Sequence, residues 1–117
     1  MKNCILYGIP NCDTTKKAMA WLTKNKTAFS FHNYKDKGIS KEKLAEWFEK
    51  ESWELLFNKR STTWKELPAT VQEKINNPAA AIQVMVENNS IIKRPVVEYN
   101  NKLLVGFNEN DFKKVFK

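Results

Sequence analysis

The sequence is short of the residues that most often build metal and phosphate sites. Its 117 residues include one histidine, two cysteines, two arginines and three glycines. His32 alone supplies neither a zinc site of familiar spacing nor a choice of partners for a cysteine–histidine pair. Gly8, Gly38 and Gly106 lie far apart in the chain, which excludes a glycine-rich phosphate-binding loop. We therefore expect no bound metal or cofactor.

Long apolar runs are also missing. The apolar residues 4–7 end at the breakers of residues 8–11 (GIPN). This run is far shorter than the apolar region of a signal peptide or a membrane span. We therefore expect a cytoplasmic protein that does not contact membranes.

Arginine is scarce although the chain is basic. Eighteen lysines and two arginines against thirteen acidic residues give a formal net charge of +7. The lysines are scattered and usually lie beside an acid, as in residues 41–43 and 49–51. This pattern indicates a solvated surface, and we expect no direct binding to nucleic acid; a functional basic patch is the alternative.

The two cysteines have different surroundings. Cys4 begins an apolar stretch with the composition of a buried strand, and Cys12 follows the far end of that stretch. At ~3.3 Å per strand residue they lie well beyond the ~7 Å reach of a disulfide. We expect two reduced thiols, which fits the cytoplasm, and we interpret Cys4 as a residue that fills the core.

Aromatic residues are plentiful, and the predicted elements alternate regularly. Seven Phe, four Trp and three Tyr supply a core without metal or disulfide cross-links, and the length suits one domain. We expect the four tryptophans in the core. The pattern predicts a strand over residues 3–7, a helix from Cys12 or Asp13 to Asn25, and a strand over residues 28–34. Such a unit is normally parallel and right-handed.

A long and mostly helical stretch follows. The predicted helices run from Ser40 to about Glu51, over residues 53–57, from a capping box at residues 70–73, and from Asn77-Pro78 to about Asn88. The polar residues 58–63 between them are expected to form a loop.

The C-terminal part predicts a hairpin and a last helix. Residues 95–99 and 102–105 flank a two-residue Asn-Asn turn, and Asn108 can cap a helix that ends near the C-terminus. The order is βαβ, an insert at about residues 38–90, then ββα. This order predicts an α/β, thioredoxin-like fold in a single domain over residues 1–117, with the helical insert between the second and third strands.

Cys12 is the strongest candidate for a reactive residue. A cysteine where a strand turns into a helix faces the unpaired N–H groups and the positive end of that helix, which favour the thiolate. Thr14 and Thr15 add hydroxyls for anion binding, whereas the carboxylate of Asp13 opposes a thiolate. We expect the helix dipole and Arg94 to outweigh Asp13 and hold the pKa of Cys12 below ~8.5. On spacing alone, a lone cysteine is usually a small buried hydrophobe, but we favour reactivity because Cys12 lies in a polar loop and not in an apolar run.

Arg94-Pro95 is the second candidate. A proline that opens a strand tolerates the loss of its N–H there, and its peptide bond is open to the cis form. In a thioredoxin-like fold this point lies against the cysteine loop, where Arg94 can hold an anionic ligand or stabilise the thiolate. A surface arginine before an edge strand is the alternative. Arg60 lies in a polar segment and, on these grounds alone, is interpreted as a loop residue.

Four motifs in order along the chain resemble the arsenate reductase (ArsC)/Spx family, in particular its YffB-like branch. They are residues 7–18 (YGIPNCDTTKKA), 55–64 (LLFNKRSTTW), 92–96 (IKRPV) and 104–107 (LVGF). Because the motifs are separate and correctly spaced, the resemblance covers nearly the whole chain.

The resemblance implies a thioredoxin-like fold with a helical insert and a redox-active cysteine. In arsenate reductases of this family, the cysteine that matches Cys12 attacks arsenate. Arginines that match Arg60 and Arg94 hold the oxyanion, and glutathione with glutaredoxin resolves the adduct. We take as candidate substrate-binding residues Asn11, Asp13, Thr14, Thr15 and Pro95.

Three departures from the family pattern bear on function. Arsenate reductases of the family commonly carry a histidine in place of Gly8 and a third anion-binding arginine in place of Gly106-Phe107. Spx regulators carry a Cys-x-x-Cys switch, whereas Thr15 follows Cys12 here. The leading hypothesis is a monothiol reductase resolved by an external thiol such as glutathione, with a small-thiol adduct favoured over arsenate as substrate. The alternative is an Spx-like regulator that binds RNA polymerase.

Overall fold

The N-terminal strand, helix and strand form in the predicted order. The computed structural model describes residues 4–116. It contains β1 (Cys4–Gly8), α1 (Asp13–Lys24) and β2 (Ser30–Asn33). The first strand is predicted over residues 3–7. Residue 3 lies outside the described residues, and the observed strand extends one residue beyond the prediction, to Gly8. The second strand is shorter than predicted, because the single helical turn α2 (Tyr34–Lys37) begins where its last residue was expected.

The C-terminal hairpin and helix agree with the sequence prediction. β3 (Val96–Tyr99) and β4 (Lys102–Val105) are joined by Asn100 and Asn101, whose φ angles are 51° and 66°. Asparagine is among the few residues that adopt this left-handed conformation readily, which a tight two-residue hairpin needs. α8 (Glu109–Phe116) is capped by Asn108, whose Oδ1 accepts a hydrogen bond of 3.1 Å from the Asp111 N–H.

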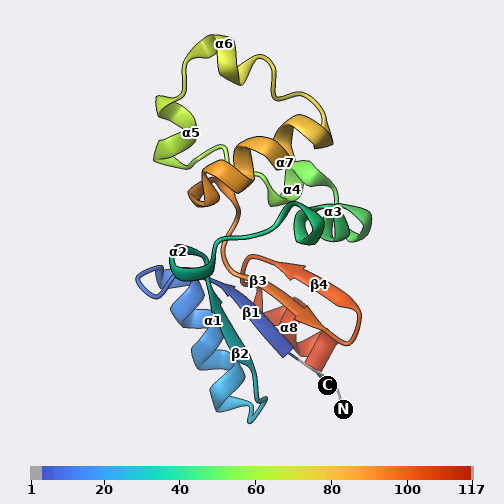
Figure 1. Cartoon of the computed structure of the whole chain (residues 1–117). Coiled ribbons are helices and arrows are strands. Elements are labelled where there is room, and N and C mark those ends of the chain that lie inside the picture. The colour runs from blue at the N-terminus through green and yellow to red at the C-terminus, as the bar shows by residue number, and fades with distance from the viewer. Residues whose placement is uncertain (1–3, 117) are drawn as a thin grey trace. The chain divides into compact units, whose positions relative to one another are not determined.

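The described strands form one sheet in the order β2-β1-β3-β4 (Figure 1). β1 pairs parallel with β2 and antiparallel with β3, and β3 pairs antiparallel with β4. With the helices, this is the predicted thioredoxin-like fold. One face of the sheet packs against α1 and α8 in a single apolar cluster. The buried members of that cluster are Cys4, Leu6, Ala18, Trp21, Leu22, Val97 and Phe112.

The contacts within the chain divide it into two compact units. One comprises Met1–Lys37 and Arg94–Lys117, here called the strand unit, and the other, here called the helical unit, comprises Gly38–Lys93. The helical unit holds α3 (Lys41–Lys50), α4 (Trp53–Leu56), α5 (Thr62–Glu66), α6 (Ala69–Gln72), α7 (Pro78–Glu87) and the 3₁₀ turn η1 (Asn89–Ile91).

Two of the predicted caps in the helical unit form and one does not. The Ser40 hydroxyl accepts a hydrogen bond from the Lys43 N–H, and Asn77 Oδ1 accepts one from the Ala80 N–H, as expected for residues that start helices. The capping box predicted at residues 70–73 is wrong, because Pro68 occupies the N-cap and α6 already begins at Ala69. Part of the polar segment predicted as a loop is helical instead, since the Ser61 hydroxyl caps α5.

Aromatic packing in the helical unit centres on Phe57. Its ring meets those of Trp53 and Trp64 edge to face, with centroids 5.8 and 4.9 Å apart. Trp21 and Trp47 are buried as predicted, whereas Trp53 and Trp64 are only half-buried. The expectation that all four tryptophans lie in the core is therefore correct for two of them.

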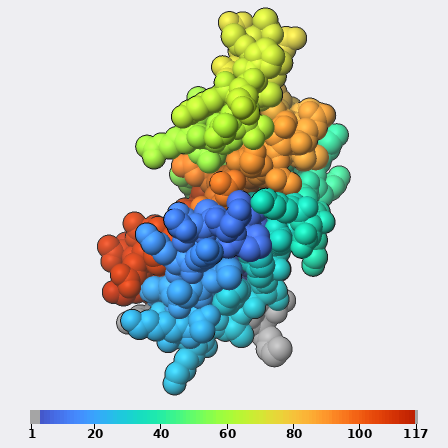
Figure 2. Space-filling view, turned by 90° about the vertical axis from the view of Figure 1, so that its left-hand side faces the viewer, coloured from blue at the N-terminus to red at the C-terminus, as the bar shows by residue number. Residues whose placement is uncertain are grey.

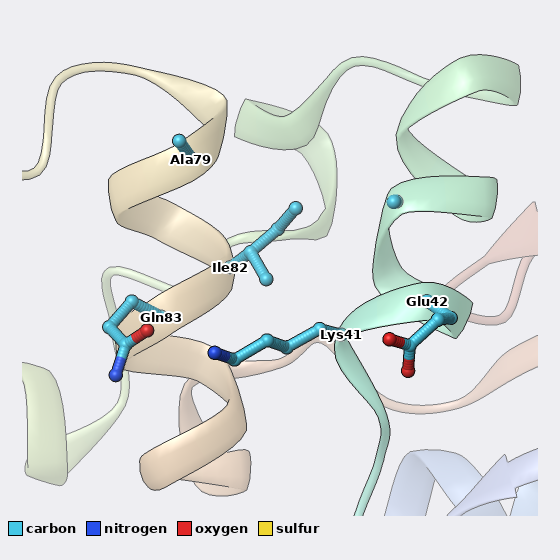
Figure 3. A pocket seen from close by; sticks show the side chains of 6 residues that line it. Lys41, Glu42, Ala79, Ile82 and Gln83 are labelled. Carbon is cyan, nitrogen blue, oxygen red and sulfur yellow. The ribbon is translucent and has the colours of Figure 1, made fainter.

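An open hollow of about 390 Å³ lies between α3 and α7. Figure 3 shows Lys41 of α3 and Ile82 of α7 extending toward one another across it. Its lining contains no cysteine, histidine or arginine, so none of the reactive residues predicted from the sequence lies there.

Within residues 4–116, no helix has the length and apolar composition needed to cross a membrane.

Phe112 is expected to be essential to the strand unit. It is fully buried, and its ring packs edge to face on Trp21 at 5.4 Å. Replacing it with alanine, Phe112→Ala, should lower the free energy of unfolding by about 3–5 kcal/mol, as loss of a buried aromatic ring typically does. Urea denaturation followed by circular dichroism measures this. The exposed neighbour change Lys113→Ala is the control and should cost less than about 0.5 kcal/mol; equal effects of the two changes would contradict the described packing.

Candidate active site

Cys12 occupies the N-cap of α1, at the end of the loop that follows β1. Its backbone is extended, and its carbonyl accepts the first hydrogen bond of the helix from the Lys16 N–H at 2.9 Å. The side chain is half-buried, while Pro10, Asn11, Asp13 and Thr14 around it are exposed. Figure 2 shows the blue N-terminal segment and α1 at the surface that faces the viewer. Cys12 is therefore a half-buried residue flanked by exposed neighbours.

The surroundings of Cys12 favour its thiolate form. Partial burial acts to raise its pKa, but hydrogen bonds outweigh burial, and the pKa falls below the ordinary thiol value. The largest of these contributions comes from the Thr15 hydroxyl, followed by the Thr15 N–H, the Arg94 side chain and the Thr14 N–H. The two amides belong to the first turn of α1, where N–H groups have no partner within the helix.

The direction of this pKa shift agrees with the sequence prediction, but its causes differ in rank. From the sequence, the helix dipole and Arg94 are the expected causes, and Thr15 is a candidate substrate-binding residue. In the structure the Thr15 hydroxyl contributes most and Arg94 contributes less. Asp13, expected to oppose the thiolate, is exposed and is not among the causes of the shift.

Arg94 and Pro95 precede β3, the strand beside β1. Val96 is paired with Tyr7, so the start of β3 lies next to the C-terminal end of β1, from which the Cys12 loop departs. The Arg94–Pro95 peptide bond is cis, and the Pro95 carbonyl accepts a hydrogen bond of 2.7 Å from the Gly106 N–H. This topology explains how two motifs more than 80 residues apart, counted from Cys12 to Arg94, reach one site.

Two tyrosines, Tyr7 of β1 and Tyr34 of α2, pack together, and the charge of Arg94 reaches Tyr34. The Tyr7 hydroxyl donates a hydrogen bond of 2.7 Å to Glu98 Oε1, and the rings of Tyr7 and Tyr34 stack at 6.3 Å. Burial raises the pKa of Tyr34 well above its ordinary value; the charges of Tyr7 and Glu98 act in the same direction, and Arg94 acts against them. Tyr34 therefore stays a neutral phenol within the range of the Arg94 charge.

Arg60 belongs to the helical unit. It is exposed, and its N–H donates to Asn58 Oδ1 at 3.2 Å in the turn that leads into α5. Its participation in the site is an expectation from the family resemblance and remains a prediction.

Cys4 has the opposite environment to Cys12. It is buried in the apolar cluster beneath α1 and α8, and burial raises its pKa to about 11. Both cysteines are free thiols. The interpretation of Cys4 as a residue that fills the core agrees with this position.

The close approach of Gly8 to Thr15 is not predicted from the sequence. A side-chain carbon at this position would lie only 2.7 Å from Thr15 Oγ1. The sequence feature that could have indicated this approach is a glycine at the last position of a buried strand, directly before the reactive loop.

Among the described residues, no three His, Cys, Asp or Glu side chains gather closely enough to hold a metal ion.

The chain is similar in sequence or structure to proteins named ArsC, Spx and YFFB. A model of the ArsC family matches residues 7–115. The global transcriptional regulator Spx of Streptococcus agalactiae is 29% identical over 110 residues, which cover 92% of this chain and 79% of that protein. A solved structure named YFFB protein is 37% identical, has a TM-score of 0.93 and covers 98% of this chain and 100% of its own. The solution structure of an arsenate reductase (ArsC) related protein from Brucella melitensis is 38% identical, has a TM-score of 0.74 and covers 98% and 95% of the two chains.

The two cysteines should differ sharply in alkylation. Cys12 should react with iodoacetamide at a rate that rises with pH to a midpoint below the ordinary thiol pKa, because only the thiolate attacks. Cys4 should stay unmodified in the folded protein until the pH approaches 11. Mass spectrometry of labelled peptides measures both, with Cys12→Ser and Cys4→Ser as controls. A Cys12 midpoint at or above that of an unfolded cysteine would contradict the described environment.

Proposed function

The chain belongs to the ArsC family, and on that premise we propose that it is a thiol-dependent reductase in which Cys12 is the single nucleophile. The observation that carries the proposal is the half-exposed sulfur of Cys12 at the start of α1, with a lowered pKa and several hydrogen-bond donors around it. A reactive thiolate at an accessible helix N-terminus is typical of cysteines that attack disulfides and oxyanions.

The preferred substrate is a mixed disulfide of a small thiol such as glutathione. In the first step the Cys12 thiolate attacks the glutathione sulfur, an S–S bond between Cys12 and glutathione forms, the original S–S bond breaks, and the other thiol leaves as a thiolate. In the second step the thiolate of a free glutathione attacks the glutathione sulfur of the mixed disulfide at Cys12. This step releases Cys12 as a thiolate together with oxidised glutathione, so the free glutathione is oxidised as the other thiol of the substrate is reduced.

The other candidate residues bind and orient the anionic substrate in this proposal. Arg94 interacts with the Cys12 sulfur and offers a planar, two-point grip on a carboxylate or oxyanion. Arg60 supplies a second positive group. The loop residues Asn11, Asp13 and Thr14, together with Pro95, line the approach to the sulfur. Glutaredoxin is the proposed protein partner, and the proposed setting is the cytoplasm, where glutathione is reduced.

A second candidate function is regulation by binding RNA polymerase. The similarity to Spx over 92% of the chain favours it. Thr15 counts against it, because the Cys-x-x-Cys switch of Spx regulators requires a cysteine at that position. Purification of the protein from its own cells separates the candidates, since the enzyme should carry a small thiol on Cys12 and the regulator should be recovered with the polymerase.

The two possible substrates should be used very differently. We expect measurable reduction of a glutathione mixed disulfide and weak or absent reduction of arsenate. An oxyanion near a thiolate needs several positive groups, and Phe107 packs its ring on Phe112 at 4.9 Å where arsenate-reducing relatives have an arginine. An assay that couples glutathione and glutaredoxin to NADPH oxidation measures both reactions, with Cys12→Ser as the control. Efficient arsenate reduction that is lost in Cys12→Ser would contradict the substrate assignment.

Arg94 should not be replaceable by lysine. Arg94→Ala and Arg94→Lys should both lower kcat/KM for the glutathione mixed disulfide, by roughly tenfold or more for the alanine change, because hydrogen bonds between charged groups are lost. The change Lys102→Ala, which removes one exposed positive charge from β4, is the matched control. If Arg94→Lys kept full activity, Arg94 would act only as a point charge.

A further inference from the structure

The Thr15 hydroxyl is buried in an unusual position. Thr15 is fully buried at the third residue of α1, and its Oγ1 makes no hydrogen bond of normal geometry to any described residue. A buried hydroxyl without a partner is costly, so such groups generally have one. Thr15 follows Cys12 by three residues in the first turn of α1, and its hydroxyl acts to lower the pKa of the Cys12 thiol. A neutral thiol is a weak acceptor, whereas a thiolate is a strong one.

Gly8 leaves the space that the Thr15 side chain occupies. A Cβ at position 8 would lie 2.7 Å from Thr15 Oγ1, closer than real Cβ atoms approach, and 3.0 Å from Thr15 Cγ2, which is a tight contact. Rotation of Thr15 does not remove the conflict, because a β-branched residue in a helix exchanges Oγ1 and Cγ2 among few allowed positions. The bare backbone at the end of β1 and the hydroxyl in the first turn of α1 therefore fit together.

We propose that Gly8 and Thr15 act as a pair in which the Thr15 hydroxyl donates a hydrogen bond to the Cys12 thiolate and Gly8 holds that hydroxyl in place by lacking a side chain. The proposal deepens the proposed function, since it rests on Cys12 as the nucleophile. In this proposal Thr15 stabilises the Cys12 thiolate rather than binding the substrate. It makes Gly8 a positioning residue that acts through Thr15.

The Thr15 half of the proposal is tested by the pH dependence of Cys12 alkylation. Thr15→Val keeps the shape and removes the hydroxyl, and it should move the midpoint upward and lower the rate at neutral pH by roughly tenfold, as loss of a hydrogen bond to a charged group does. Thr15→Ser keeps the hydroxyl and should stay within roughly threefold of the wild type. Thr23→Val, an exposed change on the same helix, is the matched control and should have no effect. An unchanged midpoint in Thr15→Val would overturn the proposal.

The Gly8 half is tested by comparing stability with reactivity. Gly8→Ala should lower the urea midpoint of unfolding and raise the alkylation midpoint. The double variant Gly8→Ala with Thr15→Ala removes both crowded atoms and leaves only the Thr15 Cβ, 3.4 Å away, in ordinary contact. Its urea midpoint should return to that of Thr15→Ala, while its alkylation midpoint stays high. A purely structural role would restore both, and a Gly8→Ala variant that matches the wild type in both would overturn the pairing.

Failure of this inference is distinguishable from failure of the proposed function. Alkylation reports on the Cys12 sulfur whatever the natural substrate is, whereas turnover of the glutathione mixed disulfide reports on the reductase. Shifts in alkylation as expected, without any turnover, would leave the pair intact and contradict the reductase. Turnover without the alkylation shifts would support the reductase and contradict the pairing of Gly8 with Thr15. If Thr15→Val does not fold, the comparison of Thr15→Ser with Thr15→Ala replaces it, because that pair also differs by one hydroxyl.

Discussion

The polar groups in the first turn of α1, which lower the pKa of Cys12, are the constraint on which the site depends. Packing of α1 against the sheet places this turn at the end of β1. Ala18 and Leu22 are buried on the inner side of the helix and pack in one cluster with Leu6 of β1. The apolar core thus fixes the direction of the N–H groups, and their direction makes the sulfur acidic. Stability and reactivity have a common source in this packing.

The two arginines belong to different units of the chain. Arg94 is carried by the strand unit, directly before the strand that pairs with β1, so its position follows from the same sheet that positions Cys12. Arg60 is carried by the helical unit, in a turn that Asn58 and the Ser61 cap of α5 define. The eighteen lysines offer charge without the planar geometry of a guanidinium.

The departures from the family pattern form a consistent set. Spx regulators have a second cysteine at the position of Thr15, and arsenate reductases of the family commonly have a histidine at that of Gly8. Thr15 and Gly8 are in close approach here, so any side chain at position 8 would meet the threonine. Phe107 belongs to the aromatic packing around Phe112 rather than to a ring of charges.

Local patterns in the sequence determined most elements. Alternation and apolar stripes placed the strands and α1, and polar caps placed α3, α7 and α8, because these depend on neighbours within a few residues. The capping box at residues 70–73 was wrong because Pro68 starts the helix earlier, a competition that spacing alone does not rank. The sequence also identified Cys12 and Arg94 as candidates. Only the tertiary structure decided that position 8 has no room for a side chain, since this depends on the distance between a strand end and a helix packed upon it.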